Sequence, residues 1–184
     1  MSARVAARRF CRFRPGTRPP SPETSGVPDD GFCLSAFLVV ESAVRPGEVL
    51  LGRIDPEGPW SEAGGLSGER IRRWPDRWML PASHLLLFES PGDAARRVSA
   101  ELLGRPIDDA GRPQVFSDTY GRGADGGDPH WDLHFVYRLS WPDPAPAVGS
   151  LWRELAFRPV RTMAASEFAR DHQDVLALVG LRDR

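Results

Sequence analysis

The sequence contains neither lysine nor asparagine, so all 24 of its basic residues are arginines. Together with 18 glycines and 18 prolines among 184 residues, this bias indicates a GC-rich coding sequence and says little about function. The 24 arginines nearly balance 25 acidic residues, and the formal net charge is −1. The chain therefore has no overall charge that would attract a nucleic acid or an anionic membrane.

Long apolar runs and paired cysteines are also absent. No segment approaches the roughly 20 consecutive apolar residues that a transmembrane helix requires. The only cysteines, Cys11 and Cys33, could form a single disulfide, but they fit neither a disulfide framework nor a metal-ligand spacing. We expect two free thiols in a reducing cytoplasm, where disulfides are rare.

The first 30 residues differ in composition from the rest of the chain. Residues 1–18 contain six arginines and no acidic residue, without the apolar core of a secretory signal. Residues 15–30 contain five prolines, which is typical of a linker. The segment could be an organelle presequence or contact phosphates; we expect instead a disordered arm or a start codon assigned too early. The predicted organisation is a flexible Arg/Pro-rich arm over residues 1–30 and one domain over residues 31–184.

Segments rich in apolar, β-branched and aromatic residues predict the strands. The first two, over residues 32–41 and 48–54, are separated by the turn signal Pro46-Gly47 and predict a hairpin. Pro81 separates the next two. The remaining predicted segments are strands over 77–80, 84–88, 115–120, 131–141 and 151–160, and loops over 55–68 and 122–129.

Two helices are predicted. The clearer one begins at Ser90, a good N-cap, with Pro91 at its first position and Asp93 three residues after the cap, and it ends at Gly104. Residues 165–179 predict an amphipathic helix. Its apolar side contains Phe168, Val175, Leu176 and Val179. Because the strands and helices show no regular βαβ alternation, the expected fold class is α/β (α+β), a mixed sheet sandwiched between α-helices.

Residues 78–104 resemble the Nudix hydrolases. In that family a W-x-L-P-G-G turn leads into the box G-x5-E-x7-R-E-U-x-E-E-x-G-U, where U is bulky and apolar. The residues that match here are Trp78, Leu80, Pro81, Glu89, Arg97, Glu101 and Gly104. The order of the flanking strands is also similar, so the resemblance covers about residues 31–180 and implies a Nudix-like mixed sheet between helices.

The resemblance implies a magnesium site. In Nudix hydrolases the metal neutralises phosphate oxygens and activates the water that attacks a diphosphate linked to a nucleoside. Magnesium requires hard oxygen ligands in octahedral geometry. Carboxylates at helix positions i, i+3 and i+4 share one face and can converge on the same ions. In this chain those positions are 98, 101 and 102.

The sequence departs from the family on that face. Val98 and Leu102 stand where the family has glutamates, and only Glu101 remains. With Ala94 they form an apolar stripe at i, i+4 and i+8, which predicts packing surface instead of a cation site. Further departures are Ala82, Ser83 and His84 in the glycine turn, and Ser99 and Arg105 at apolar positions.

The resemblance implies roles for three residues that match. Glu101 would be the catalytic carboxylate and magnesium ligand, Glu89 a supporting acid and Arg97 an orienting residue. Each has a structural alternative. Glu89 could interact with the positive end of the helix dipole and pair with Arg97, and Glu101 could be a solvated helix residue.

A second set of candidates lies in the strand predicted over 131–141. Period-2 alternation places His130, Asp132 and His134 on one face, a credible set of transition-metal ligands. Such residues span about 13 Å, too wide for one ion, so at most two could bind together. The simpler interpretation is a polar sheet face with hydrogen-bonded histidines. If the strand lines a cleft, Asp132 and His134 are the ligand-binding candidates.

These observations leave two main functional hypotheses. The first is a nominally Mg-dependent Nudix hydrolase of nucleoside diphosphates linked to another moiety, with catalysis impaired by Val98 and Leu102. The second is a non-catalytic nucleotide-binding or regulatory module on the same fold. Both predict a nucleotide or nucleoside-diphosphate derivative as partner. A third possibility, a homodimer or protein partner contact through the apolar stripe and exposed tryptophans, has the least support.

Overall fold

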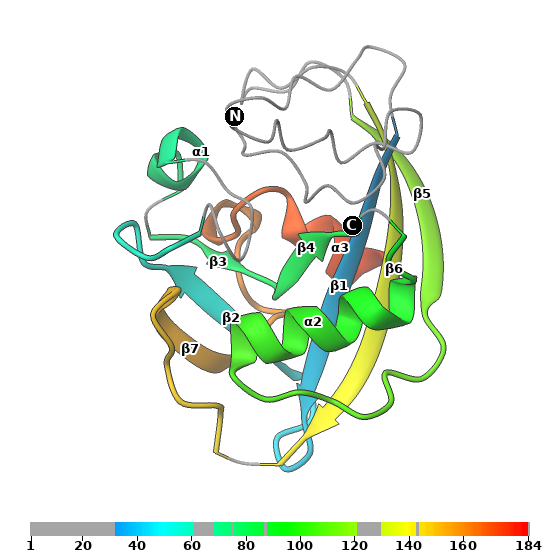
Figure 1. Ribbon diagram of the computed structural model, residues 1–184. Coiled ribbons are helices and arrows are strands. Elements are labelled where there is room, and N and C mark those ends of the chain that lie inside the picture. The colour runs from blue at the N-terminus through cyan, green and yellow to red at the C-terminus, as the bar shows by residue number, and fades with distance from the viewer. Residues whose placement is uncertain are drawn as a thin grey trace.

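The apolar segments of the sequence form one mixed sheet of seven strands (Figure 1). The structure, a computed structural model, describes residues 32–60, 68–74, 76–86, 88–120, 130–142 and 144–183. The predicted arm over 1–30 and loop over 122–129 lie outside these residues. In chain order the elements are β1 (Phe32–Ser42), β2 (Glu48–Ile54), α1 (Gly68–Arg72), β3 (Trp78–Met79), β4 (Ala82–His84), α2 (Pro91–Leu103), β5 (Gln114–Tyr120), β6 (His130–Trp141), β7 (Trp152–Pro159), a 3-10 helix (Ala165–Glu167) and α3 (His172–Leu178).

Strand β1 is the centre of the sheet. It pairs parallel with β6 over its full length, and antiparallel with β2 and β4. β5 pairs antiparallel with β6, while β3 and β7 pair antiparallel with β2. The predicted hairpin between β1 and β2 is confirmed. Its turn places Gly47 at a φ of +83°, a conformation that glycine adopts without the steric cost of a side chain.

Helices cover both faces of this sheet. Figure 1 shows α2 lying across one face, with α3 on the other; apolar side chains of each helix pack into the adjoining core. The expected mixed sheet between α-helices is therefore confirmed. Within the described ranges, no helix has the length and apolar character needed to cross a bilayer.

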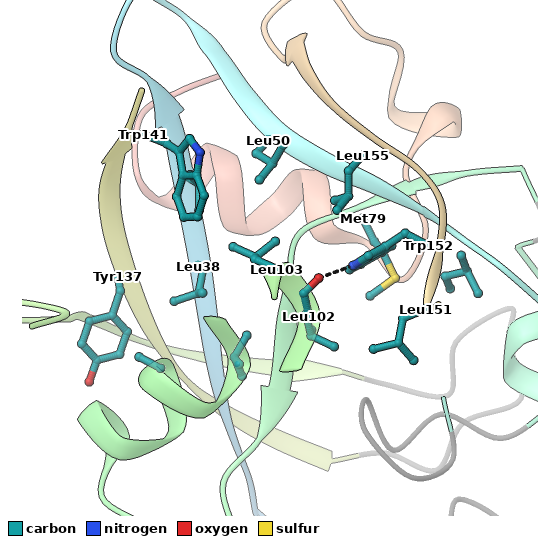
Figure 2. Close-up of a cluster of buried hydrophobic side chains, with 14 of the residues drawn as sticks. Leu38, Leu50, Met79, Leu102, Leu103, Tyr137, Trp141, Leu151, Trp152 and Leu155 are labelled. Atoms are coloured by element: carbon teal, nitrogen blue, oxygen red, sulfur yellow. Dashed lines mark hydrogen bonds between the residues drawn. The ribbon is translucent and has the colours of Figure 1, made fainter. Parts of the chain in front are cut away.

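The first core lies between the sheet and α2, and Trp152 is one of its buried residues (Figure 2). The indole Nε1 of Trp152 donates a hydrogen bond to the carbonyl of Leu102 at 2.5 Å. Its ring meets Trp60 edge to face, with centroids 4.7 Å apart. The last carbonyls of a helix have no partner inside the helix. Trp152 therefore satisfies one of them and fixes the end of α2 against β7.

The second core lies between the sheet and α3, and it contains a buried histidine. Nδ1 of His172 accepts a hydrogen bond from the N–H of Leu80 at 3.0 Å, so the neutral imidazole is the form that fits. The ring of Phe37 packs edge-on against His172, with centroids 5.2 Å apart. Burial, followed by the charges of Arg170 and His134, holds the pKa of His172 well below its ordinary value.

We expect the free energy of unfolding to decrease as the pH falls through about 6.5, the pKa of histidine in an unfolded chain. There the unfolded chain binds a proton that the folded chain, with the depressed pKa of His172, does not bind. The stabilising contribution of the neutral His172 is complete above pH ~6.5. As the pH falls from there toward the folded-state pKa, the free energy of unfolding decreases by up to about 1.4 kcal/mol per pH unit.

Urea unfolding at several pH values between about 7.5 and 5 measures this dependence. His172→Gln, which does not titrate, should flatten the loss at acidic pH. The matched variant His84→Gln, at a partly exposed position, should leave it in place. Equal slopes for the wild type and His172→Gln would contradict the prediction.

The strand predicted over residues 84–88 is wrong. The strand in this region is β4, and it ends at His84. Pairing with β1 selects these residues, since Ala82, Ser83 and His84 lie opposite the middle of β1. After His84 the chain turns, and the N–H of Glu89 donates to the carbonyl of Leu86 at 3.0 Å.

The single helix predicted over residues 165–179 is also wrong. A 3-10 helix ends at Glu167, and α3 begins only at His172. Between them Phe168 forms a bridge with Trp78, and the N–H of Ala169 donates to the Trp78 carbonyl at 2.8 Å. This pairing to β3 replaces the hydrogen bonds that would continue the helix. All four predicted apolar residues are still buried in the second core: Phe168, Val175, Leu176 and Val179.

Candidate functional site

Helix α2 starts and ends where the sequence predicts. The Oγ of Ser90 accepts a hydrogen bond from the N–H of Asp93 at 3.1 Å, and Pro91 is the first helical residue. Gly104 ends the helix with a φ of +66°. Because the first N–H groups of a helix have no internal acceptor, this cap favours a start at Pro91. The start position in turn determines which residues of α2 face the core.

Arg97 is the centre of an ion-pair network between α2 and the turn before it. Its Nε and one Nη donate to the two carboxylate oxygens of Glu89 at 2.7 and 2.9 Å, a bidentate geometry. The same Nη donates to the carbonyl of His84 at 2.8 Å, and the other Nη to Glu101 at 3.2 Å. Arg97 thus connects the end of β4, the following turn and the next turn of α2.

The pair of Glu89 and Arg97 is largely shielded from solvent. Their side chains are 10% and 16% exposed, and Glu89 also accepts the N–H of Leu86 at 2.8 Å. Burial lowers the pKa of the Arg97 guanidinium, but the hydrogen bonds and charges of Glu89 and then Glu101 outweigh it and raise that pKa above its ordinary value. The geometry therefore agrees with the structural interpretation, in which Arg97 is a permanent cation that fixes the turn.

The predicted apolar stripe of α2 is confirmed as packing surface. Val98 has no exposed area, and Leu102 is 3% exposed. Both lie in the first core, while Ala94 packs against Ala36 beneath the same helix. Ser99 is buried too, and its Oγ donates a hydrogen bond to the carbonyl of Arg105 at 2.6 Å.

This burial bears on the predicted homodimer contact, which stays a prediction, because the apolar stripe of α2 lies inside the chain's own core. Four of the six tryptophans are also buried, whereas Trp74 is half-buried and the side chain of Trp131 lies outside the described residues. The buried tryptophans are Trp60, Trp78, Trp141 and Trp152. The described residues thus give the proposed dimer contact no apolar stripe on α2.

Glu101 is the one carboxylate left at the three metal-binding positions. Its side chain is 37% exposed, and its Oε2 forms the longer ion pair with Arg97. Across the parts of the chain that the structure describes, no three His, Cys, Asp or Glu side chains are placed to hold a metal ion. Because magnesium needs several oxygen ligands in octahedral geometry, these residues do not fit the site that the resemblance implies.

The two candidate ligand-binding residues, Asp132 and His134, lie on the other face of the sheet. Both are buried, and the ring of His134 packs against Phe37 with centroids 5.1 Å apart, on the side of α3. Tyr137 lies three residues after His134 on β6, so its side chain points to the opposite face of the sheet and packs toward α2. The predicted alternation is correct for Asp132 and His134, whereas the side chain of His130 lies outside the described residues. The sheet separates Asp132 and His134 from Arg97. A role in ligand binding for them stays a prediction independent of the α2 network.

Three parts of this site could not be found from side-chain patterns. The carbonyl of His84 and the N–H of Leu86 are backbone groups, so their partners depend on the path of the turn. Phe88 has a φ of +63° and a highly exposed side chain. No sequence signal marks a positive φ at a residue other than glycine, asparagine or aspartate.

Solved structures share the fold of this chain, although no protein-family model and no curated protein matches the sequence. A MutT/nudix family protein from Enterococcus faecalis superimposes with a TM-score of 0.52 at 15% identity, over 78% of this chain and 59% of that one. This chain thus spans less than two thirds of the length of the Enterococcus faecalis protein. The dihydroneopterin triphosphate pyrophosphohydrolase of E. coli superimposes with a TM-score of 0.51 at 14% identity, over 79% of this chain and 92% of that one. The Nudix domain of Shewanella oneidensis NrtR, solved with ADP ribose, superimposes with a TM-score of 0.50 at 19% identity, over 79% of this chain and 84% of that one.

Proposed function

We propose that this chain, which has the Nudix fold, binds a nucleoside diphosphate derivative and hydrolyses it poorly or not at all with magnesium. The observation that carries the proposal is the burial of Val98 and Leu102 in the core under α2. Positions that the resemblance assigns to metal ligands are here apolar and have almost no exposed area. Fold and chemistry are separable, so a ligand site can persist without the metal site.

The proposed ligand class rests on the fold. The Nudix domain of Shewanella oneidensis NrtR, which shares it, was solved as a complex with ADP ribose. An ADP-containing ligand is therefore the first probe to test. The Arg97 network supports a ligand site near α2 indirectly, because its hydrogen bonds hold the turn before α2 against the helix.

A second candidate function is magnesium-dependent hydrolysis, favoured by the exposure of Glu101. In that case Glu101 would be the catalytic carboxylate, with Glu89 as a supporting acid and Arg97 as the orienting residue. The two candidates differ in what Glu101 does, since it would be required for turnover only in the second.

Titration calorimetry with ADP ribose and ADP, together with phosphate-release assays on a panel of nucleoside diphosphate derivatives with and without magnesium, distinguishes them. We expect measurable binding, turnover close to the uncatalysed background and no effect of Glu101→Gln on either. Glu48→Gln is the matched control, because Glu48 also pairs with an arginine on the surface, Arg45, at 2.7 Å.

Two outcomes would contradict the proposal. Rapid magnesium-dependent turnover that Glu101→Gln abolishes and Glu48→Gln preserves would establish the hydrolase. Absence of binding to every member of the panel would remove the nucleotide as ligand.

A further inference from the structure

Phe88 combines two unfavourable properties at one position. Its side chain is 82% exposed, although it is a large apolar ring. Its backbone φ is +63°, in the left-handed region that is disfavoured for a residue with a bulky side chain. Glycine would avoid both the strain and the exposed ring. Folding alone therefore gives no reason for phenylalanine at this position.

The turn that carries Phe88 is fixed on both sides. The N–H of Glu89 donates to the carbonyl of Leu86 at 3.0 Å, and the N–H of Leu86 donates back to the Glu89 carboxylate at 2.8 Å. The bidentate pair with Arg97 then fastens Glu89 to α2. Phe88 directly precedes Glu89. Its ring therefore extends into solvent from a backbone that several hydrogen bonds hold in place.

The other exposed apolar side chains do not share this combination. Within the described residues the large exposed hydrophobic side chains besides Phe88 are the aliphatic Val44, Val115 and Val148, and none of them has a positive φ. The other non-glycine residues with positive φ in the described part of the chain, Arg170 and Asp171, are polar. Strained residues that the surrounding structure holds in place cluster at ligand clamps.

We propose that Phe88 is a stacking platform for the aromatic base of the ligand. The inference rests on the proposed function and adds the recognition element for one part of the ligand. A ring that the turn keeps out of the core offers its π-face to a planar ring, and every base has such a face. Stacking therefore adds affinity for any nucleobase, and Phe88 discriminates poorly between adenine and the other bases.

Calorimetric titration of the full chain with ADP, and separately with inorganic pyrophosphate, tests the assignment. Phe88→Ala and Phe88→Gly should weaken ADP binding about tenfold, because each removes one base–aromatic stacking contact. Phe88→Tyr keeps the ring and should stay within about twofold of the wild type. Pyrophosphate, which has no base, should bind the wild type and all three variants with the same affinity.

The two truncations also separate binding from stability. Phe88→Gly should raise the thermal midpoint because glycine tolerates a positive φ, whereas Phe88→Ala keeps that strain and should not raise it. A gain in stability together with a loss of ADP affinity in Phe88→Gly is the result expected of a residue retained for binding.

The outcomes separate this inference from the proposed function. If the wild type binds ADP and Phe88→Ala binds it equally well, the stacking role is wrong and the proposed function stands. If the wild type binds no nucleoside diphosphate, both are wrong. If Phe88→Ala loses self-association in sedimentation and keeps its ADP affinity, the ring contacts a second copy of the chain and the stacking role is overturned.

Discussion

Replacing Val98 and Leu102 together by glutamate is expected to abolish the cooperative thermal transition in metal-free buffer. Each side chain is almost fully buried under α2, and its burial contributes roughly 1.5–3 kcal/mol that glutamate would forfeit. A carboxylate there would also lose its hydration or have to be protonated. Two such changes approach the total stability of about 5–15 kcal/mol that is usual for a folded domain.

Circular dichroism melting curves with and without magnesium measure this effect. Ala100→Glu on the exposed side of the same helix is the matched control and should change the midpoint little. Phosphate release by the double variant gives the second readout. A nearly neutral double substitution, or one that gains magnesium-dependent hydrolysis, would show that the two positions border an accessible cleft and would overturn their assignment as packing surface.

Gly52→Ala is expected to destabilise the protein by about 3 kcal/mol. A Cβ at Gly52 would lie 2.2 Å from Cε3 and 2.4 Å from Cζ3 of the Trp152 ring. That ring has little freedom to move, because its Nε1 is bonded to the Leu102 carbonyl and Trp60 packs against it. The added methyl group must therefore displace β2 from β7 or break the hydrogen bond that holds the end of α2.

The measurement is the thermal midpoint, which should fall by about 6–12 °C for a domain of this size. Gly92→Ala is the matched control. Only the Oγ of Ser90, at 4.0 Å, lies near the added methyl group there, and alanine in a helix is favoured by up to about 1 kcal/mol. Equal midpoints for Gly52→Ala and Gly92→Ala would show that Trp152 can give way. The double variant Gly52→Ala with Trp152→Leu should cost less than the sum of the single changes, since the clash is then absent.

The parts of the fold that local chemistry determines could be predicted from the sequence. Helix α2 begins and ends at predicted residues because Ser90, Pro91 and Gly104 act through bonds within a few positions of themselves. Strands β1, β2, β5, β6 and β7 follow from apolar runs and turn signals. The apolar stripe on α2 was predicted to be buried because its spacing matches the period of the helix.

The parts that depend on distant partners could not be predicted. The end of β4 is set by its pairing with β1, and the break before α3 by the bridge between Phe168 and Trp78. In the candidate site, the pairing of Glu89 with Arg97 was anticipated as an alternative. The turn geometry that adds the His84 carbonyl to this pairing, and exposes Phe88, depends on backbone torsions that no residue pattern records.

The parallel pairing of β1 with β6 has a consequence for how the chain reaches this structure during synthesis. Glu41 on β1 and Arg138 on β6 form a bidentate ion pair at 2.8 Å, although they lie 97 positions apart in the chain. Because the loop between such partners must close before their contacts can form, high-contact-order pairing slows folding. A ribosome will have produced nearly the whole domain before β1 meets its central neighbour. Until then the apolar edge of β1 is open to aggregation, and efficient expression is expected to depend on chaperones that bind the nascent chain.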